Sequence, residues 1–127
     1  MLSPAAKERY ARHLLLAEIG EAGQQRLCSA RVQLPAAADP RSARIAHDYL
    51  VRAGVAVQTD PQRERDAPRL QLSEDAVRAL AGEPALEPAA AALLGALHAV
   101  EAIKSELGLG APLELPPGLR LCAEGTR

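Results

Sequence analysis

Residues 31–59 read RVQLPAAADPRSARIAHDYLVRAGVAVQT, and this stretch decides the fold class. Residues 31–34 and 55–59 are short, apolar and rich in valine, which predicts two strands. A helix is predicted over 41–53, because its apolar residues recur on one stripe and Gly54 follows as a natural stop. A strand, a helix and a strand joined by short turns are typical of a parallel strand pair in an α/β fold.

Further elements are predicted on both sides of this unit. Proline, glycine and capping residues mark where they begin and end. They are helices over 4–16 and 21–28, a third short strand over 70–72, a helix capped by Ser73 and ended by Gly82, a long helix over 89–107, and a hairpin over 113–121 that turns at Pro117 and Gly118.

The long helix carries the clearest amphipathic pattern in the chain. Its largest apolar residues recur every three or four positions, and we expect this stripe to face the core. His98 and several polar residues are expected to lie off the stripe. The stripe consists of Leu93, Leu97, Val100, Ile103 and Leu107.

Length and composition exclude several protein classes. The 127 residues suit one globular domain, with 48% hydrophobic and 24% charged residues. Fifteen basic against sixteen acidic side chains give a net charge of −1, which argues against binding to nucleic acid or a polybasic membrane surface. We see no apolar run that approaches the length of a membrane span and no secretory signal. We therefore expect a cytoplasmic protein.

The apolar residues are mostly alanine and leucine, with no Phe, no Trp and only two Tyr. Small side chains bury little apolar area each, and burial stabilises a fold by about 25 cal/mol per Å² of apolar surface. We expect a thin core that gains stability from a partner surface. Two cysteines are too few for a disulfide framework or a zinc site, so no metal site is expected.

The run RYARHLLLAEIGEAGQQRL (residues 9–27) closely resembles the N-terminal signature of the ThiF/MoeB/HesA proteins, the bacterial relatives of ubiquitin-activating enzymes. Residues 29–32 are similar to that family's first strand. Residues 48–55 (DYLVRAGV) resemble the end of its first helix, and 57–60 (VQTD) the strand that ends in an acid. AAALLGALHAVEAIKSELGLG (90–110) is similar to the family's late helix.

The resemblance implies a single truncated, degenerate Rossmann-like domain, residues 1–127. It would consist of an N-terminal helical arm (1–30), a degenerate nucleotide-binding unit (31–60), a shortened connector (61–88) and the late helix with its tail (89–127). Members of the family use ATP and Mg²⁺ to adenylate the C-terminal glycine of a ubiquitin-like or sulfur-carrier protein, and they act as dimers.

The glycines that cradle phosphate in the family are missing. Their positions fall on Ala38, Pro40, Arg41 and Ala43, where side chains block the close approach of backbone N–H groups to an anion. Asp60 matches the family's ribose-binding acid and is interpreted as a relic. The family's metal-binding and zinc-binding positions have no counterpart after it. We therefore expect no cofactor and no ATP site in this chain.

Arg12 is the most informative residue that the resemblance retains. In the family, the second arginine of this motif reaches across the dimer into the partner's ATP site, so Arg12, with Arg9, is a candidate arginine finger in trans. The alternative is an exposed helix arginine that pairs with Glu8.

Other polar residues have ordinary interpretations. His13 and His98 are expected to be surface or packing histidines. His47 and Asp48 are adjacent on a helix and are not expected to form a catalytic pair. Cys28 is predicted to be a small apolar filler, and a sulfur-carrying role for Cys122 is left open.

Three functions follow as hypotheses. The first is a ThiF-family pseudoenzyme that acts as a dimer partner of a full-length activating enzyme or of a second copy of itself. The second is a stand-alone module that binds the tail of a ubiquitin-like or sulfur-carrier protein. The third is a remnant enzyme with residual activating chemistry at Cys122.

Overall fold

The strands β1 (Arg31–Leu34) and β2 (Ala56–Thr59) pair in parallel, with Arg31 opposite Ala56 and Leu34 opposite Thr59. Helix α4 (Pro40–Ala53) connects them and ends at Gly54, whose φ of 95° is the left-handed conformation that favours glycine. This arrangement confirms the predicted strand, helix and strand, and the chain is a small α/β protein with a two-stranded sheet.

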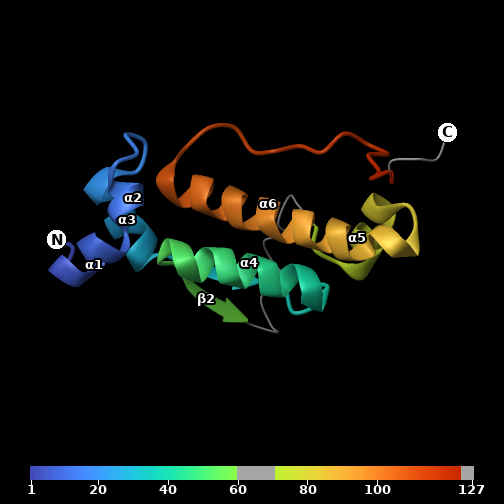
Figure 1. Ribbon diagram of the computed structural model, residues 1–127, viewed down its shortest axis with the longest axis horizontal. Coiled ribbons are helices and arrows are strands. Elements are labelled where there is room, and N and C mark those ends of the chain that lie inside the picture. Colours follow the sequence, from blue (N-terminus) through green and yellow to red (C-terminus); the bar gives the residue numbers. More distant parts are fainter. Residues whose placement is uncertain (60–70, 124–127) are drawn as a thin grey trace.

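The computed structural model describes residues 1–59 and 71–123 (Figure 1). Three helices precede the sheet, and two helices and a 3₁₀ turn follow it. They are α1 (Pro4–Arg9), α2 (Ala11–Leu14), α3 (Gly20–Ser29), α5 (Glu74–Ala81), the 3₁₀ turn η1 (Pro84–Leu86) and α6 (Glu87–Leu107).

Helices α4 and α6 lie side by side and run in the same direction, with α1–α3 at one end of the molecule and α5 at the other (Figure 1). Helices α4 and α6 approach closely because Gly95 of α6 has no side chain. A Cβ at this position would clash with the carbonyl oxygen of Ser42 in α4. The Ser42 hydroxyl donates to the carbonyl of Ala91 at 2.8 Å. A glycine and a serine thus set the distance between the two longest helices.

The core consists of two apolar clusters, one toward each end of α6. Both are built from alanine, leucine and valine, as the composition predicts. The first contains Leu27, Ala30, Leu34, Ala46, Leu50, Ala53, Val55, Ala99 and Leu107. The second contains Leu72, Val77, Leu80, Ala81, Ala90, Ala91 and Leu94.

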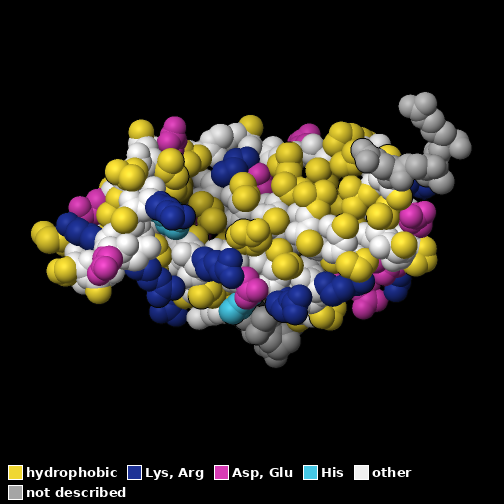
Figure 2. All heavy atoms as spheres, viewed as in Figure 1, with side chains coloured by type: hydrophobic (Ala, Val, Ile, Leu, Met, Phe, Trp, Pro, Cys, Tyr) yellow, Lys and Arg dark blue, Asp and Glu magenta, His cyan; other side chains and the backbone are white. Residues whose placement is uncertain are grey.

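The predicted core stripe of α6 is partly wrong. Leu93 and Val100 are 39% and 50% exposed, whereas Leu94 and His98 are buried. Almost every side of this helix carries apolar residues, so residue size does not identify the inner face. Close packing on α4 selects the side with the small residues, and hydrophobic side chains remain gathered over α6 and the segment that returns along it (Figure 2).

Three predicted elements differ from the structure. The helix predicted over 4–16 is interrupted at Tyr10, whose φ of −102° and ψ of 18° lie outside the helical region. Gln71 and Leu72 are not in a strand, and Leu70 lies outside the described residues. The hairpin over 113–121 is wrong, since residues 111–123 contain a turn but no strand.

The C-terminal segment is held by single contacts instead of a hairpin ladder. The N–H of Leu121 donates to the carbonyl of Leu80 at 2.8 Å, and the N–H of Leu113 donates to Glu101 at 2.9 Å. Prolines at 112, 116 and 117 lack the N–H that a ladder requires, which explains why the alternating pattern does not form strands.

The helical run Pro84–Leu107 has the length and the mean hydropathy, 1.4, of a membrane-spanning helix. The expectation that no such run is present is therefore wrong by these two measures. Core helices of soluble proteins share both properties, and here α6 contributes buried residues to both core clusters. The location of the protein in the cell stays a prediction.

Candidate functional site

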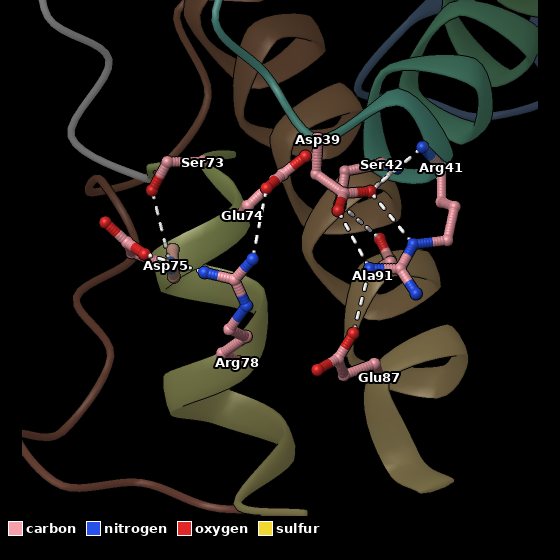
Figure 3. Close-up of polar contacts among 10 residues, drawn as sticks. Asp39, Arg41, Ser42, Ser73, Glu74, Asp75, Arg78, Glu87 and Ala91 are labelled. Atoms are coloured by element: carbon pink, nitrogen blue, oxygen red, sulfur yellow. Dashed lines mark hydrogen bonds and ion pairs between the residues drawn. The ribbon is translucent and has the colours of Figure 1, made fainter. Parts of the chain in front are cut away.

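The junction between β1 and α4 is where a nucleotide-binding unit would hold phosphate. The chain leaves β1 at Leu34, turns, and enters α4 at Pro40. Asp39 caps the helix: its Oδ1 accepts from the backbone N–H of Arg41 at 2.9 Å and of Ser42 at 3.3 Å (Figure 3). Two N–H groups of the first helical turn, which have no partner within the helix, therefore donate to a carboxylate of the chain itself.

The Asp39 carboxylate is also paired with a cation. Arg41 reaches back with two contacts, Nε to Oδ1 at 3.2 Å and Nη2 to Oδ2 at 2.9 Å, and extends to Glu87 at 3.3 Å (Figure 3). Asp39 is only 1% exposed. The hydrogen bonds from Arg41 lower the pKa of Asp39 below its ordinary value of 3.8, and the same contact raises the pKa of Arg41.

Two further contacts lock this junction to the rest of the fold. The N–H of Asp39 donates to the carbonyl of Leu72 at 2.7 Å, and Ser42 is bonded to α6. A phosphate at this helix terminus would have to displace a buried, paired carboxylate, and Pro40 offers no N–H in its place. We call this arrangement a closed junction, because the Asp39 carboxylate occupies the place at the start of α4 where an external anion would bind.

The N-terminal helices are joined to α4 through the side chain of Gln24, which is fully buried. Its Oε1 accepts from Nδ1 of His13 at 2.9 Å, and its Nε2 donates to the carbonyl of Ala53 at 2.9 Å. The ring of Tyr10 stacks on that of His13, with centroids 5.8 Å apart. His13 is thus a packing histidine whose Nδ1 carries a proton, because Gln24 uses its amide nitrogen for Ala53.

Sequence reasoning missed Gln24. The available signal was a polar residue at a helical position between Gly23 and Leu27, both of which are buried. Gly54 belongs to the same contact, since a Cβ there would lie 2.9 Å from the Tyr10 hydroxyl and 3.0 Å from Nε2 of Gln24.

Arg12 and Arg9 are both exposed. The Arg9 guanidinium lies 5.4 Å from the centroid of the Tyr10 ring. Together with Arg52, at the end of α4, they line a hollow of about 340 Å³ to which Glu8 also contributes. Within the described residues Arg12 forms no ion pair, so the predicted pairing with Glu8 is absent.

The remaining candidate residues do not come together. Asp60 lies outside the described residues. Cys122 is exposed on the C-terminal segment, and Cys28 is exposed too, which corrects its prediction as a filler. His47 Nδ1 and Asp48 Oδ1 lie 3.8 Å apart on the surface of α4. Over residues 1–59 and 71–123, no cluster of His, Cys, Asp and Glu suits a metal ion.

Comparison of the chain with protein-family models, with curated proteins and with solved structures finds no match.

Proposed function

We propose that this chain is a ThiF/MoeB-like protein with a degenerate Rossmann-like fold and no ATP site of its own. It acts as the dimer partner of an enzyme that adenylates a ubiquitin-like or sulfur-carrier protein. The observation that carries the proposal is the closed junction between β1 and α4. Asp39 is buried there, capped on α4 and paired with Arg41, at the position where an active relative would need free N–H groups.

The N-terminal helices supply the second support. Arg12 is exposed and without an ion pair in the described part of the chain, so its guanidinium is available to a partner. The buried bonds of Gln24 to His13 and Ala53 hold this region on α4. An exposed arginine on N-terminal helices that are held against α4 is suited to contact phosphate oxygens in a neighbouring subunit.

A calorimetric titration of the purified chain with MgATP tests the first half of the proposal. We expect no heat of binding above the dilution signal, while an active ThiF/MoeB homologue gives a clear isotherm under the same conditions. A structure with ATP seated beside residues 38–43 would overturn the proposal.

A mixing experiment tests the second half. The chain is combined with a full-length ThiF/MoeB homologue, and the adenylation of a carrier protein is measured with and without it. We expect the wild-type chain to co-purify with the enzyme and to raise its rate. Arg12→Ala should remove that increase, because removal of an arginine finger costs about 10³-fold or more in other systems. Arg26→Ala, an exposed arginine of α3, is the matched control.

If the Arg12 variant supports full activity, the finger is excluded. The stand-alone binding module is then the second candidate, and it predicts that the chain binds a peptide ending in two glycines without any effect on the enzyme's rate. Full function of a Cys122→Ser variant would exclude residual chemistry at that cysteine.

A further inference from the structure

Strand β1 has one edge without a strand partner among the described residues. The N–H of Ala56 donates to the carbonyl of Ala30 at 3.1 Å, so the backbone groups of Ala30 point toward β2. Because these groups alternate along a strand, those of Arg31 and Gln33 point away from β2. In the described part of the chain no backbone or side-chain group bonds to them on that side.

This edge opens into a hollow of about 720 Å³, within the size range of ligand sites. Arg31, Val32 and Gln33 line one wall, and the C-terminal half of α6 with residues 108–113 lines the other. The second wall is fastened by three bonds around Glu101 and Lys104. Lys104 donates to Glu101 at 2.7 Å and to the carbonyl of Ala111 at 2.8 Å, and Glu101 accepts from the N–H of Leu113.

His98 adds an independent observation. It lines the same hollow from α6, is only 8% exposed, and has no hydrogen-bond partner among the described residues. Burial lowers its pKa, so the imidazole is neutral at neutral pH and offers one donor and one acceptor. Because no buried side-chain nitrogen or oxygen among the described residues lacks a partner, the unbonded ring nitrogens of His98 are accessible from the hollow, where a polar group of a ligand can reach them.

We propose that an extended peptide segment of a partner protein binds in this hollow and adds to β1 as a third strand. Two N–H and two carbonyl groups of Arg31 and Gln33 supply the main-chain bonds, and His98 contacts the segment from the opposite wall. The occupant is a single extended chain and not the β1 edge of a second copy, because each β1 edge is itself flanked by α6 and residues 108–113.

Charge defines the segment further. Arg31 is exposed at the start of β1 and forms no ion pair within the described residues, whereas Lys104 is already neutralised by Glu101. The bound segment therefore carries a carboxylate beside Arg31. The exposed carboxylate of Glu106 on the α6 wall disfavours acidic side chains on that side.

The test uses a randomised eight-residue peptide library displayed on phage, selected on the full folded chain. Enriched peptides are then measured against Gln33→Pro and Gln33→Thr. Proline removes the outward N–H and places its ring on the free edge, and it leaves the bonds to β2 intact because Gln33 does not face β2. Threonine keeps the N–H and changes only the side chain.

We expect enriched peptides to bind Gln33→Pro at least about tenfold more weakly than the wild-type chain, because proline removes a main-chain hydrogen bond and blocks the edge. For Gln33→Thr we expect a loss in affinity of less than about threefold. Arg31→Gln should weaken peptides with a carboxylate and leave those without one unchanged. On the wild-type chain, bound peptide should slow amide hydrogen exchange at Arg31 and Gln33.

Failure to enrich any peptide, or equal affinity for the wild-type chain and Gln33→Pro, would overturn the inference. Unchanged exchange at Arg31 and Gln33 in the presence of bound peptide would do the same, and it does not depend on how well the proline variant folds. The inference goes beyond the proposed dimer role and needs neither ATP nor Arg12, so the two proposals fail or stand separately.

Discussion

Arg41 and Asp39 form a two-point ion pair across the first turn of α4, with Nη2 2.9 Å from Oδ2 and Nε 3.2 Å from Oδ1. The same carboxylate caps the helix, so one buried side chain satisfies both backbone N–H groups and the guanidinium. A helix terminus that commonly attracts an external anion is thereby neutralised by the chain itself.

Asp39→Ala should destabilise the protein by about 2 kcal/mol, because it removes the helix cap and leaves Arg41 with Glu87 alone. Asp39→Asn retains a capping oxygen and should lose about half as much. Asp75→Ala removes an exposed ion pair with Arg78 and should change stability by less than about 1 kcal/mol. Urea unfolding measures all three, and equal stability of Asp39→Ala and Asp75→Ala would contradict the central role of the Asp39 cap.

Gly54→Ala should destabilise the protein by about 3 kcal/mol. Its φ of 95° strains an L-residue, and the new Cβ would lie about 3 Å from Tyr10, Gln24 and Cys28. Gly108→Ala is the matched control. Its φ of 67° is also left-handed, but nothing lies within 4 Å of the added carbon, so only about 1 kcal/mol of backbone strain is expected. A similar loss for both variants in thermal or urea unfolding would mean that the Tyr10 contact carries little energy.

Gly95→Ala should lower stability even though alanine is the better helix former by about 1 kcal/mol. The added Cβ would lie 2.4 Å from the backbone oxygen of Ser42, which only a shift of α4 against α6 can relieve, at about 1–3 kcal/mol beyond the propensity gain. Gly23→Ala is also buried in a helix, but its neighbours are movable side chains of Leu107 and Ile19, so it should be tolerated within about 1 kcal/mol. Stabilisation by Gly95→Ala would show that the two helices are not in close contact.

His98 predicts a pH dependence of stability. Burial lowers its pKa below the ordinary 6.5, so the unfolded chain binds a proton there more readily than the folded one. The stability that the neutral, buried His98 ring provides is present above pH 6.5 and is lost as the pH falls below that value. The free energy of unfolding should decrease between pH 7 and pH 5, and His98→Leu should flatten that slope. Arg31, Glu101 and Lys104 line the same hollow, and the hydrogen bond from Lys104 lowers the pKa of Glu101 below its ordinary value of 4.5. An unchanged slope in the variant would assign the dependence to another group.

Most element boundaries were predictable because the residues that decide them are neighbours in the chain. Ser73 accepts from the N–H of Ala76 at the start of α5, and Gly54 and Gly82 end α4 and α5 in the left-handed conformation. The predicted bounds of β1 agree with the structure, and those of α4 and β2 differ by a single residue. The interruption at Tyr10 had no such local signal, because its side chain is buried and its hydroxyl lies beside Gly54, which comes 44 residues later in the chain.

The sequence by itself determined most helix ends, since these depend on local backbone preference, and the absence of glycine at 38, 40, 41 and 43. It also determined the parallel strand pair, because a strand, a helix and a strand joined by short turns favour that pairing. Only the tertiary structure decided which side of α6 is buried, that Arg41 reaches Glu87 as well as Asp39, and that Gln24 joins His13 to Ala53. The physical reason is distance along the chain. Contacts such as Ser42 with Ala91 join residues 49 positions apart, and on a helix that is apolar on nearly every side, periodicity does not select the face that packs.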